Sequence, residues 1–362
     1  MSRQTHIAVA LGAAVATAIA LGSISFWDWV SILNPRRKEC KSRGHLDDGY
    51  LRGIESTIGN TPLFVIKSLS EATGCVVLAK AEYLNGAGGS PKDRVALSII
   101  QRAEAAGLIH PQSGDTIYEG TVGSTGISLA TLCRARGYLA HICMPSDQAM
   151  EKSELLSKLG AKVERVQPAP IVDQDHFVNR ARRLATEHTI NPEQPGRGFF
   201  ANQFETEANW RAHYEGTGPE IYQQSRGQLD AFVSGAGTGG TISGVAMFLK
   251  SKLPGIKIVL ADPTGSGLYH KIKNGVMFHT MEKEGTRRRQ QVDTIVEGIG
   301  LTRSTANLEA GQDLIDDAVK VTDAQAMAMA RWLVEKDGIF VGSSSAVNCE
   351  EEGTIENCIS RS

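Results

Sequence analysis

The chain has 362 residues, 41% of them hydrophobic, with 38 basic and 40 acidic side chains and a net charge of −2. This length predicts two domains or lobes of about 150 residues each. The near-neutral charge argues against nucleic acid as the main ligand, and the composition excludes a wholly disordered chain.

The N-terminal region combines an apolar run with a basic step. Residues 7–27 contain no Asp, Glu, Lys or Arg and would form a helix of about 31 Å, enough to span a bilayer. The basic residues 36–43 (RRKECKSR) then lie on the cytosolic side under the positive-inside rule. We predict a membrane anchor over residues 1–35, a basic linker over 36–52 and a cytosolic body. The alternatives are a cleaved secretory peptide, a matrix presequence and a misread core helix.

The body, residues 53–347, alternates β-branched apolar runs with stretches of helical period. The predicted strands are residues 76–80, 116–118, 140–144, 162–166, 231–234 and 257–261. The predicted helices are residues 94–106, 125–136, 148–158, 178–187, 242–252 and 323–336. This alternation favours parallel sheets covered by helices, with a ligand site at the carboxyl ends of the strands. Residues 273–291 are polar and unpatterned, which predicts a solvated loop.

Cysteines and histidines give no metal or disulfide pattern. The six cysteines include no C-x-x-C pair, and no histidine falls in a pattern such as H-E-x-x-H, so we predict no metal site. Cys75, Cys133 and Cys143 lie in apolar runs and are expected to be buried, reduced thiols of an intracellular protein.

The first glycine-rich joint, NGAGGSPKDR, places Lys92 directly before a predicted helix. The helix dipole and any burial both disfavour the charged amine, and only a neutral amine attacks a carbonyl group. Spacing alone favours a plainer alternative, in which Lys92 is a surface residue that pairs with Asp93.

Two further joints have the composition of anion sites. EGTVGSTG lies between a strand and a helix, where backbone N–H groups hold a carboxylate or phosphate, or where Ser124 or Thr125 simply caps the helix. SGAGTGGT suits a phosphate but lacks the Gly-Lys-Ser/Thr ending of a nucleotide P-loop. It also fits G-x-G-x-x-G, with Asp262 at the end of a later strand, so on this joint alone an NAD(P) oxidoreductase stays open.

Taken together, the motifs indicate one protein family more specifically than any of them does alone. GNTPL, the GSPKDR lysine, EGTVGSTG, GAGTGGT and VEGIG occur in an order and spacing that resemble the cysteine synthase and cystathionine β-synthase family of pyridoxal-phosphate enzymes. With its N-terminal apolar segment, the chain is most similar to the fungal mitochondrial membrane-anchored branch of cysteine synthases.

The resemblance implies a fold and a location. The fold is a two-lobed α/β enzyme of fold-type II, like the β subunit of tryptophan synthase, with parallel-rich twisted sheets covered by helices and an added N-terminal transmembrane helix. A smaller lobe, about residues 90–200, would be inserted in the larger one. The resemblance also implies a homodimer, and a single-pass anchor in the mitochondrial outer membrane.

The resemblance assigns site residues as well. Lys92 would be the catalytic residue and would hold pyridoxal 5′-phosphate covalently. The cofactor phosphate would be bound by Gly237, Thr238, Gly239, Gly240 and Thr241. Ser344 would face the pyridine nitrogen, and Ser124 would contact the cofactor where the family usually has an asparagine. The substrate carboxylate would be bound by Thr121, Gly123, Thr125 and Gln203.

The implied reaction is a β-replacement that makes cysteine from O-acetyl-L-serine and sulfide through an aminoacrylate. A related lyase shares every motif: a serine or threonine dehydratase, a cystathionine β-synthase or a cysteine desulfhydrase. A non-catalytic membrane-bound homologue is the other alternative. Residues 348–362 are polar where the family continues with a helix and a strand, so we expect a truncated tail and weakened activity.

Overall fold

A computed structural model describes residues 51–278 and 294–350. The predicted anchor, nearly all of the basic linker, most of the predicted loop over 273–291 and the tail from residue 351 lie outside the described residues. Among the helices of the described part, none combines the length and the apolar character that a membrane crossing requires.

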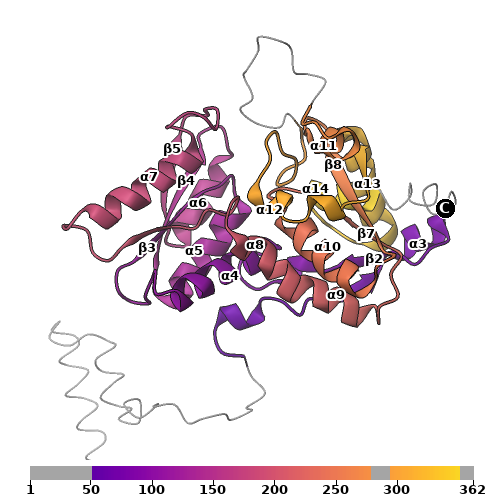
Figure 1. Ribbon diagram of the computed structural model, residues 1–362, viewed down its shortest axis with the longest axis horizontal. Helices are drawn as coiled ribbons and strands as arrows, with labels where there is room; N and C mark the ends of the chain where they lie inside the picture. The colour runs from indigo at the N-terminus through magenta and orange to yellow at the C-terminus, as the bar shows by residue number, and fades with distance from the viewer. Residues whose placement is uncertain (1–50, 279–293, 351–362) are drawn as a thin grey trace, which may run out of the picture. The chain divides into compact units, whose positions relative to one another are not determined.

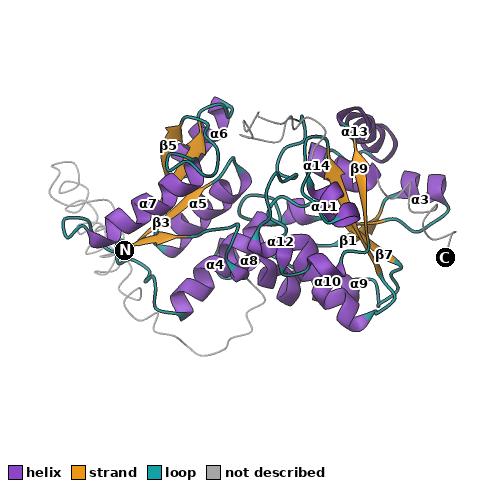
Figure 2. Ribbon diagram, turned by 45° about the horizontal axis from the view of Figure 1, so that its top comes forward, coloured by secondary structure: helices purple, strands orange, loops and turns teal. Residues whose placement is uncertain are grey.

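The first lobe is built on a four-stranded parallel sheet in the order β5-β4-β3-β6, coloured magenta in Figure 1. Its strands are β3 (Thr116–Gly120), β4 (Leu139–Pro145), β5 (Lys162–Val166) and β6 (Gly198–Phe200). Its helices are α4 (Lys92–Ala105), α5 (Ser124–Arg136), α6 (Met150–Lys158) and α7 (Phe177–Ile190). Helix α5 and helix α7 both pack on β3 and β4 (Figure 2).

The alternation of side chains along β3 and β4 separates the two faces of this sheet. Ile117, Ile142 and Met144 are buried in one core cluster with residues of α4 and α5. Tyr118 and His141 are neighbours in register and point to the opposite face, where the Tyr118 hydroxyl meets His188 Nδ1 of α7 at 2.9 Å. The face under α5 is therefore apolar, whereas the face under α7 carries polar and titratable groups.

The second lobe contains the parallel sheet β7-β8-β9, coloured orange to yellow in Figure 1. Its strands are β7 (Ala231–Ser234), β8 (Lys257–Pro263) and β9 (Asp317–Val321). The remaining helices are α3 (Lys67–Thr73), α8 (Glu207–Ala212), α9 (Gly218–Gln224), α10 (Gly240–Lys252), α11 (Leu268–Asn274), α12 (Ala306–Glu309), α13 (Asp323–Asp337) and α14 (Ser343–Glu350), with a π-helical turn at His213–Thr217. The antiparallel pair β1 (Leu63–Val65) and β2 (Leu78–Lys80) precedes both sheets in the chain.

The prediction of two lobes with parallel sheets covered by helices is confirmed. Every predicted strand and helix is present, with ends shifted by a few residues at most. Strands β1, β6 and β9 and the shorter helices were not predicted. Cys133 and Cys143 are buried as expected, but Cys75 is exposed, because it lies in the turn between α3 and β2 rather than in a strand.

A network of buried ion pairs lies behind the GNTPL motif. The guanidinium of Arg94, on α4, contacts Glu82 at 2.7 Å and Glu220 of α9 at 2.6 Å, and Lys80 contacts Glu220 at 2.6 Å. Thr61 of the motif donates to Glu82 and receives a hydrogen bond from Arg94. Burial alone would raise the pKa of Glu220, but the hydrogen bonds from Arg94 and Lys80 outweigh it and lower that pKa to about 2. Both carboxylates are therefore held ionised against α4.

Candidate active site

A cleft of 1950 Å³ opens at the carboxyl ends of strands β3 and β7. It is lined by all but one of the residues that the resemblance assigned to the site: Lys92, Thr121, Gly123, Ser124, Thr125, Gln203, Gly237, Thr238, Gly239, Thr241 and Ser344. The exception, Gly240, follows Gly239 as the first residue of α10. The structure thus brings together residues from both lobes that are far apart in the sequence.

The topology of the first sheet explains where the cleft forms. The chain runs outward from β3 through β4 to β5, and then returns to place β6 on the other side of β3. Ligands of open parallel sheets bind at such a reversal of strand order. Thr121 follows β3 and Gln203 follows β6, so the reversal puts the second glycine-rich joint beside Gln203.

A hydrogen bond within the cleft joins the second glycine-rich joint to the segment around Gln203. The Thr125 hydroxyl donates to Gln203 Oε1 at 2.5 Å, and both side chains are buried. Helix α5 begins at Ser124, with Gly123 as its N-cap and no side-chain cap bond. Capping of this helix by Ser124 or Thr125 is therefore wrong, and the first backbone N–H groups of α5 have no side-chain acceptor among the described residues.

Lys92 begins helix α4 and turns toward the cleft. Burial lowers the pKa of its amine, and the described residues offer that amine no hydrogen bond or ion pair. Asp93 does not pair with it: its carboxylate accepts the backbone N–H groups of residues 87–89 and the hydroxyl of Ser128. The alternative of a surface Lys92–Asp93 pair is therefore wrong, because Asp93 folds the preceding glycine-rich loop instead.

The third joint has a shape that only glycine allows at two positions. A Cβ atom on Gly237 would lie 2.0 Å from the carbonyl oxygen of Gly298 in the VEGIG segment. Gly239 has φ +85°, and a Cβ there would lie 2.6 Å from Leu308. Helix α10 starts after Gly239 with no side-chain cap bond. The joint therefore presents the N-terminus of a 13-residue helix to the cleft, a geometry suited to a phosphate.

The two serines lie at helix starts. Ser124 opens α5, and Ser344 lies in the first turn of α14. Asn348, one turn further along α14, accepts the backbone N–H of Gly235 at 2.7 Å and so ties this helix to the third joint.

Two residues that sequence reasoning missed connect the parts of the site. Asn209 donates to the carbonyl oxygen of Gln203 at 2.7 Å and to the Thr238 hydroxyl at 2.9 Å. His213, one helical turn later, meets the Thr241 hydroxyl at 3.2 Å, and burial lowers the pKa of its imidazole to about 3. The i, i+4 spacing of two polar residues on one helix face was the only signal available in the sequence.

Glu119, the last acidic residue before the cleft, is also fully buried. Its carboxylate oxygens accept the backbone N–H groups of Gly120 at 2.8 Å and of Gln203 at 3.0 Å. Burial nevertheless dominates and raises the pKa of this carboxyl to about 8. Glu119 therefore keeps its proton at neutral pH while it supports the backbone on both sides of the strand reversal.

This pKa predicts a loss of stability with rising pH. Between the ordinary pKa of 4.5 and about 8, the folded chain holds a proton at Glu119 that the unfolded chain has released. The free energy of unfolding should therefore fall across this window, by up to about 1.4 kcal/mol per pH unit. Urea unfolding from pH 5 to 9 measures this slope. Glu119→Gln cannot ionise, so its slope should be flatter by that amount; equal slopes in both proteins would refute the assignment.

Comparison with known proteins gives the class of this fold and site. Residues 54–350 match the family model described as pyridoxal-phosphate dependent enzyme. The chain belongs to this family, which removes the NAD(P) oxidoreductase alternative. It is 72% identical to cysteine synthase 2 of Emericella nidulans, over 84% of this chain and 73% of that protein. The crystal structure of O-ureido-L-serine synthase matches with a TM-score of 0.72 and 30% identity, over 85% of this chain and 87% of the other.

The predicted location is wrong. A relative from Saccharomyces cerevisiae, 54% identical over 82% of this chain and 75% of its own length, has the words mitochondrial cysteine synthase in its name, which mentions no membrane. This contradicts a single-pass anchor in the outer membrane with a cytosolic body. The prediction gave too much weight to apolar length, since residues 7–27 are rich in Ala and Gly, which favour insertion far less than Leu.

Proposed function

We propose that this chain makes cysteine from O-acetyl-L-serine and sulfide by pyridoxal-phosphate dependent β-replacement. The observation that carries the proposal is the half-buried amine of Lys92, which has no partner among the described residues and faces the same cleft as two uncapped helix N-termini. The 72% identity to a protein named cysteine synthase supports this reaction over dehydration, cystathionine formation or desulfuration.

The cleft residues fit the cofactor. The start of α10, with Thr238, Thr241 and the glycines of the third joint, would hold the phosphate, and Lys92 would hold the reactive carbon. Ser344 would face the pyridine nitrogen, and Ser124 the ring oxygen. When bound, pyridoxal phosphate supplies an electron sink for the Cα of an amino acid.

Lys92 would act as the base that takes the Cα proton of the substrate. Burial lowers the pKa of the Lys92 amine, which favours the neutral form that a general base requires. From the start of α4 the amine would take the Cα proton of the substrate, and acetate would leave from the β-carbon before sulfide adds there. A serine at position 344, unlike a carboxylate, offers no negative charge to a protonated pyridine, which favours elimination and replacement over transamination.

The second joint would hold the substrate carboxylate. The uncapped N–H groups at the start of α5 and the side chains of Thr121, Thr125 and Gln203 form a polar corner of the cleft. Since the positive end of the α5 dipole also points there, an α-carboxylate suits this corner better than a neutral group.

Thr125→Val tests whether the polar corner of the cleft binds the substrate carboxylate. It removes a hydroxyl that orients Gln203, and a lost hydrogen bond to a charged group costs about 1.5–3 kcal/mol. We expect the KM for O-acetyl-L-serine to rise about 10- to 100-fold, with a smaller change in kcat. Thr131→Val, on the same helix but outside the cleft lining, is the control and should keep the normal KM. An unchanged KM in Thr125→Val would remove this residue from the corner.

We also propose that the chain forms a homodimer. Large apolar side chains stand exposed on the described surface, with Phe340 91% exposed and Val172 89% exposed. A second copy that covers such side chains would remove apolar surface from water, which favours association. Light scattering should give twice the 38.9 kDa of one chain; a value for one chain at micromolar concentration would contradict the dimer.

The reaction itself is tested with the full chain loaded with pyridoxal phosphate. Steady cysteine formation from O-acetyl-L-serine and sulfide is the expected result. Pyruvate from serine or 2-oxobutyrate from threonine, cystathionine from serine and homocysteine, or sulfide release from cysteine would each select another member of the family. An absence of all four activities in the loaded protein would favour a non-catalytic homologue.

A further inference from the structure

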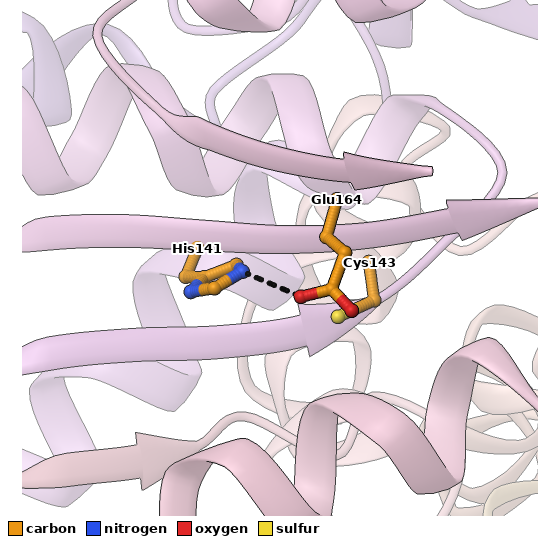
Figure 3. Close-up of side chains that lie close together, drawn as sticks. All are labelled: His141, Cys143 and Glu164. Atoms are coloured by element: carbon orange, nitrogen blue, oxygen red, sulfur yellow. Dashed lines mark ion pairs between the residues drawn. The ribbon is translucent and has the colours of Figure 1, made fainter. Parts of the chain in front are cut away.

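A second group of reactive side chains lies in the first lobe, apart from the cleft. His141 and Cys143 belong to β4 and Glu164 belongs to β5, and one potential ligand atom from each lies within 4.8 Å of the others. In Figure 3 the carboxylate of Glu164 lies beside the thiol of Cys143, and one of its oxygens faces the imidazole of His141. None of the three residues lines the cleft.

The pleat and register of the sheet bring these residues together. Residues 141 and 143 are two apart on one strand and so project from the same face, the face covered by α7. Cys143 is paired in register with Glu164 on the neighbouring parallel strand. Three different ligand types, a nitrogen, a sulfur and an oxygen, therefore converge on fixed strands rather than on a loop.

One ring nitrogen of His141, Nε2, is buried without a hydrogen bond among the described residues. The residue is 4% exposed, and within the described part of the chain its Nε2 has no hydrogen-bond partner. Glu164 Oε2 lies 3.5 Å from this nitrogen, a contact at ion-pair distance that leaves it without a hydrogen bond. A buried polar nitrogen in this condition costs free energy unless a ligand satisfies it.

The neighbouring charges orient Glu164 for a cation. Arg180 of α7 donates to Glu164 Oε1 at 2.7 Å, which leaves Oε2 directed toward His141. A partner that fixes one carboxylate oxygen is typical of the residues around a metal ligand. A dication bound by one thiolate, one carboxylate and one neutral imidazole has no net charge, so the nearby Arg180 repels it only weakly.

We propose that His141, Cys143 and Glu164 bind one borderline-soft divalent cation, for which Zn²⁺ is the best match. Thiolate, imidazole and carboxylate are the zinc ligands of proteins, at about 2.0–2.3 Å from the metal. These bond lengths set the ligand atoms about 3.5 Å apart, so small side-chain rotations complete the site. The thiol of Cys143 releases its proton to solvent on binding, and water takes the fourth position on the side where Glu164 is partly exposed.

The site would stiffen the two strands, β4 and β5, that lie on one side of β3, the strand that leads into the polar corner of the cleft. The carbonyl oxygen of Cys143 accepts the backbone N–H of Thr121 at 3.0 Å, at the first residue of the second joint. A metal that ties β4 to β5 therefore acts one hydrogen bond away from the cleft, without contact to substrate or cofactor. Its expected effect is on the stability of the first lobe rather than on the chemistry.

The experiment uses the full chain with its cofactor, freed of metal by a chelator. Zn²⁺ should bind at one equivalent, release a proton and raise Tm by at least about 3 °C at saturation. Co²⁺ should bind there and give a sulfur-to-metal charge-transfer band. Mg²⁺, which prefers an all-oxygen shell, should do neither. Cys143→Ala should lose the band and at least 10-fold in Zn²⁺ affinity, whereas Cys133→Ala, a buried thiol of the same lobe, should keep both.

Two results would overturn the proposal. One is the absence of Zn²⁺ binding at 100-micromolar metal, and the other is binding of equal strength in the wild-type chain and Cys143→Ala. If Cys143→Ala does not fold, the wild-type Co²⁺ spectrum and His141→Gln decide instead: a charge-transfer band that weakens in His141→Gln supports the site, and no band in the wild-type chain refutes it.

Discussion

Lys92→Ala is expected to reduce cysteine formation at least about 10⁴-fold, the largest effect of any single substitution in this chain. The substitution removes both the covalent hold on the cofactor and the proposed base, and no other described side chain stands in for either. Burial has already lowered the pKa of this amine, so a neutral base is lost rather than a surface charge. The measurements are the rate of cysteine formation and the absorption of the cofactor in the purified variant.

The matched control is Lys152→Ala. Lys152 also lines the cleft, but its amine is paired at 2.7 Å with Glu297, whose side chain is 71% exposed, and it has no assigned part in the proposed chemistry. Its activity should stay within about threefold of the wild-type chain, because exposed pairs contribute little. Added methylamine should restore part of the activity of Lys92→Ala and none to Lys152→Ala. Residual turnover above 1% in Lys92→Ala without added amine would contradict the role of Lys92.

Strands with strong local signals were predicted well, and weak or interrupted ones were not. Residues 162–166 and 231–234 match β5 and β7 at both ends, because each contains valine or phenylalanine, which favour strands, and has glycine or proline nearby. Strand β6 is only Gly198–Phe200 and exists because the chain returns beside β3 after α7. That pairing is a tertiary event, which no local pattern records.

In the candidate site, too, the motifs could be recognised from the sequence, but the contacts that their side chains make could not. The glycine-rich joints could be recognised from residues alone, since a chain that approaches its neighbours this closely needs glycine, as at Gly237. The state of Lys92 could not, because spacing suggested a pair with Asp93, and only the folded loop shows where Asp93 binds. GNTPL was recognised as a motif, yet its contacts with Arg94, Glu82 and Glu220 join segments up to 160 residues apart.

The His141 group was missed for a related reason. A search for metal patterns favours ligands close together on one helix or loop, such as H-E-x-x-H. Here two ligands alternate along a strand and the third comes from the next strand, so the pattern exists only once the register of β4 and β5 is known.

Arg94→Met is expected to lower the free energy of unfolding by about 3–5 kcal/mol, the largest stability effect that we predict. Arg94 is the shared partner of Glu82 and Glu220, whose side chains are only 13% and 14% exposed. Removal of the guanidinium leaves two buried carboxylates with Lys80 as the one remaining cation of the network. Desolvation of such unpaired charges is costly, and methionine fills the volume without replacing a donor. Urea unfolding at pH 7 measures the loss.

Arg102→Met separates this effect from a general cost of losing an arginine on α4. Arg102 lies on the same helix and pairs with Glu215 at 2.6 Å, but these two side chains are 38% and 52% exposed. Water already solvates both charges, so we expect a loss below about 1 kcal/mol. The double variant Arg94→Met/Glu220→Gln should recover part of the free energy of unfolding that Arg94→Met loses, because it removes one buried, unpaired carboxylate. Equal losses in the two single variants, or no recovery in the double variant, would show that packing rather than charge pairing holds α4 against the GNTPL segment.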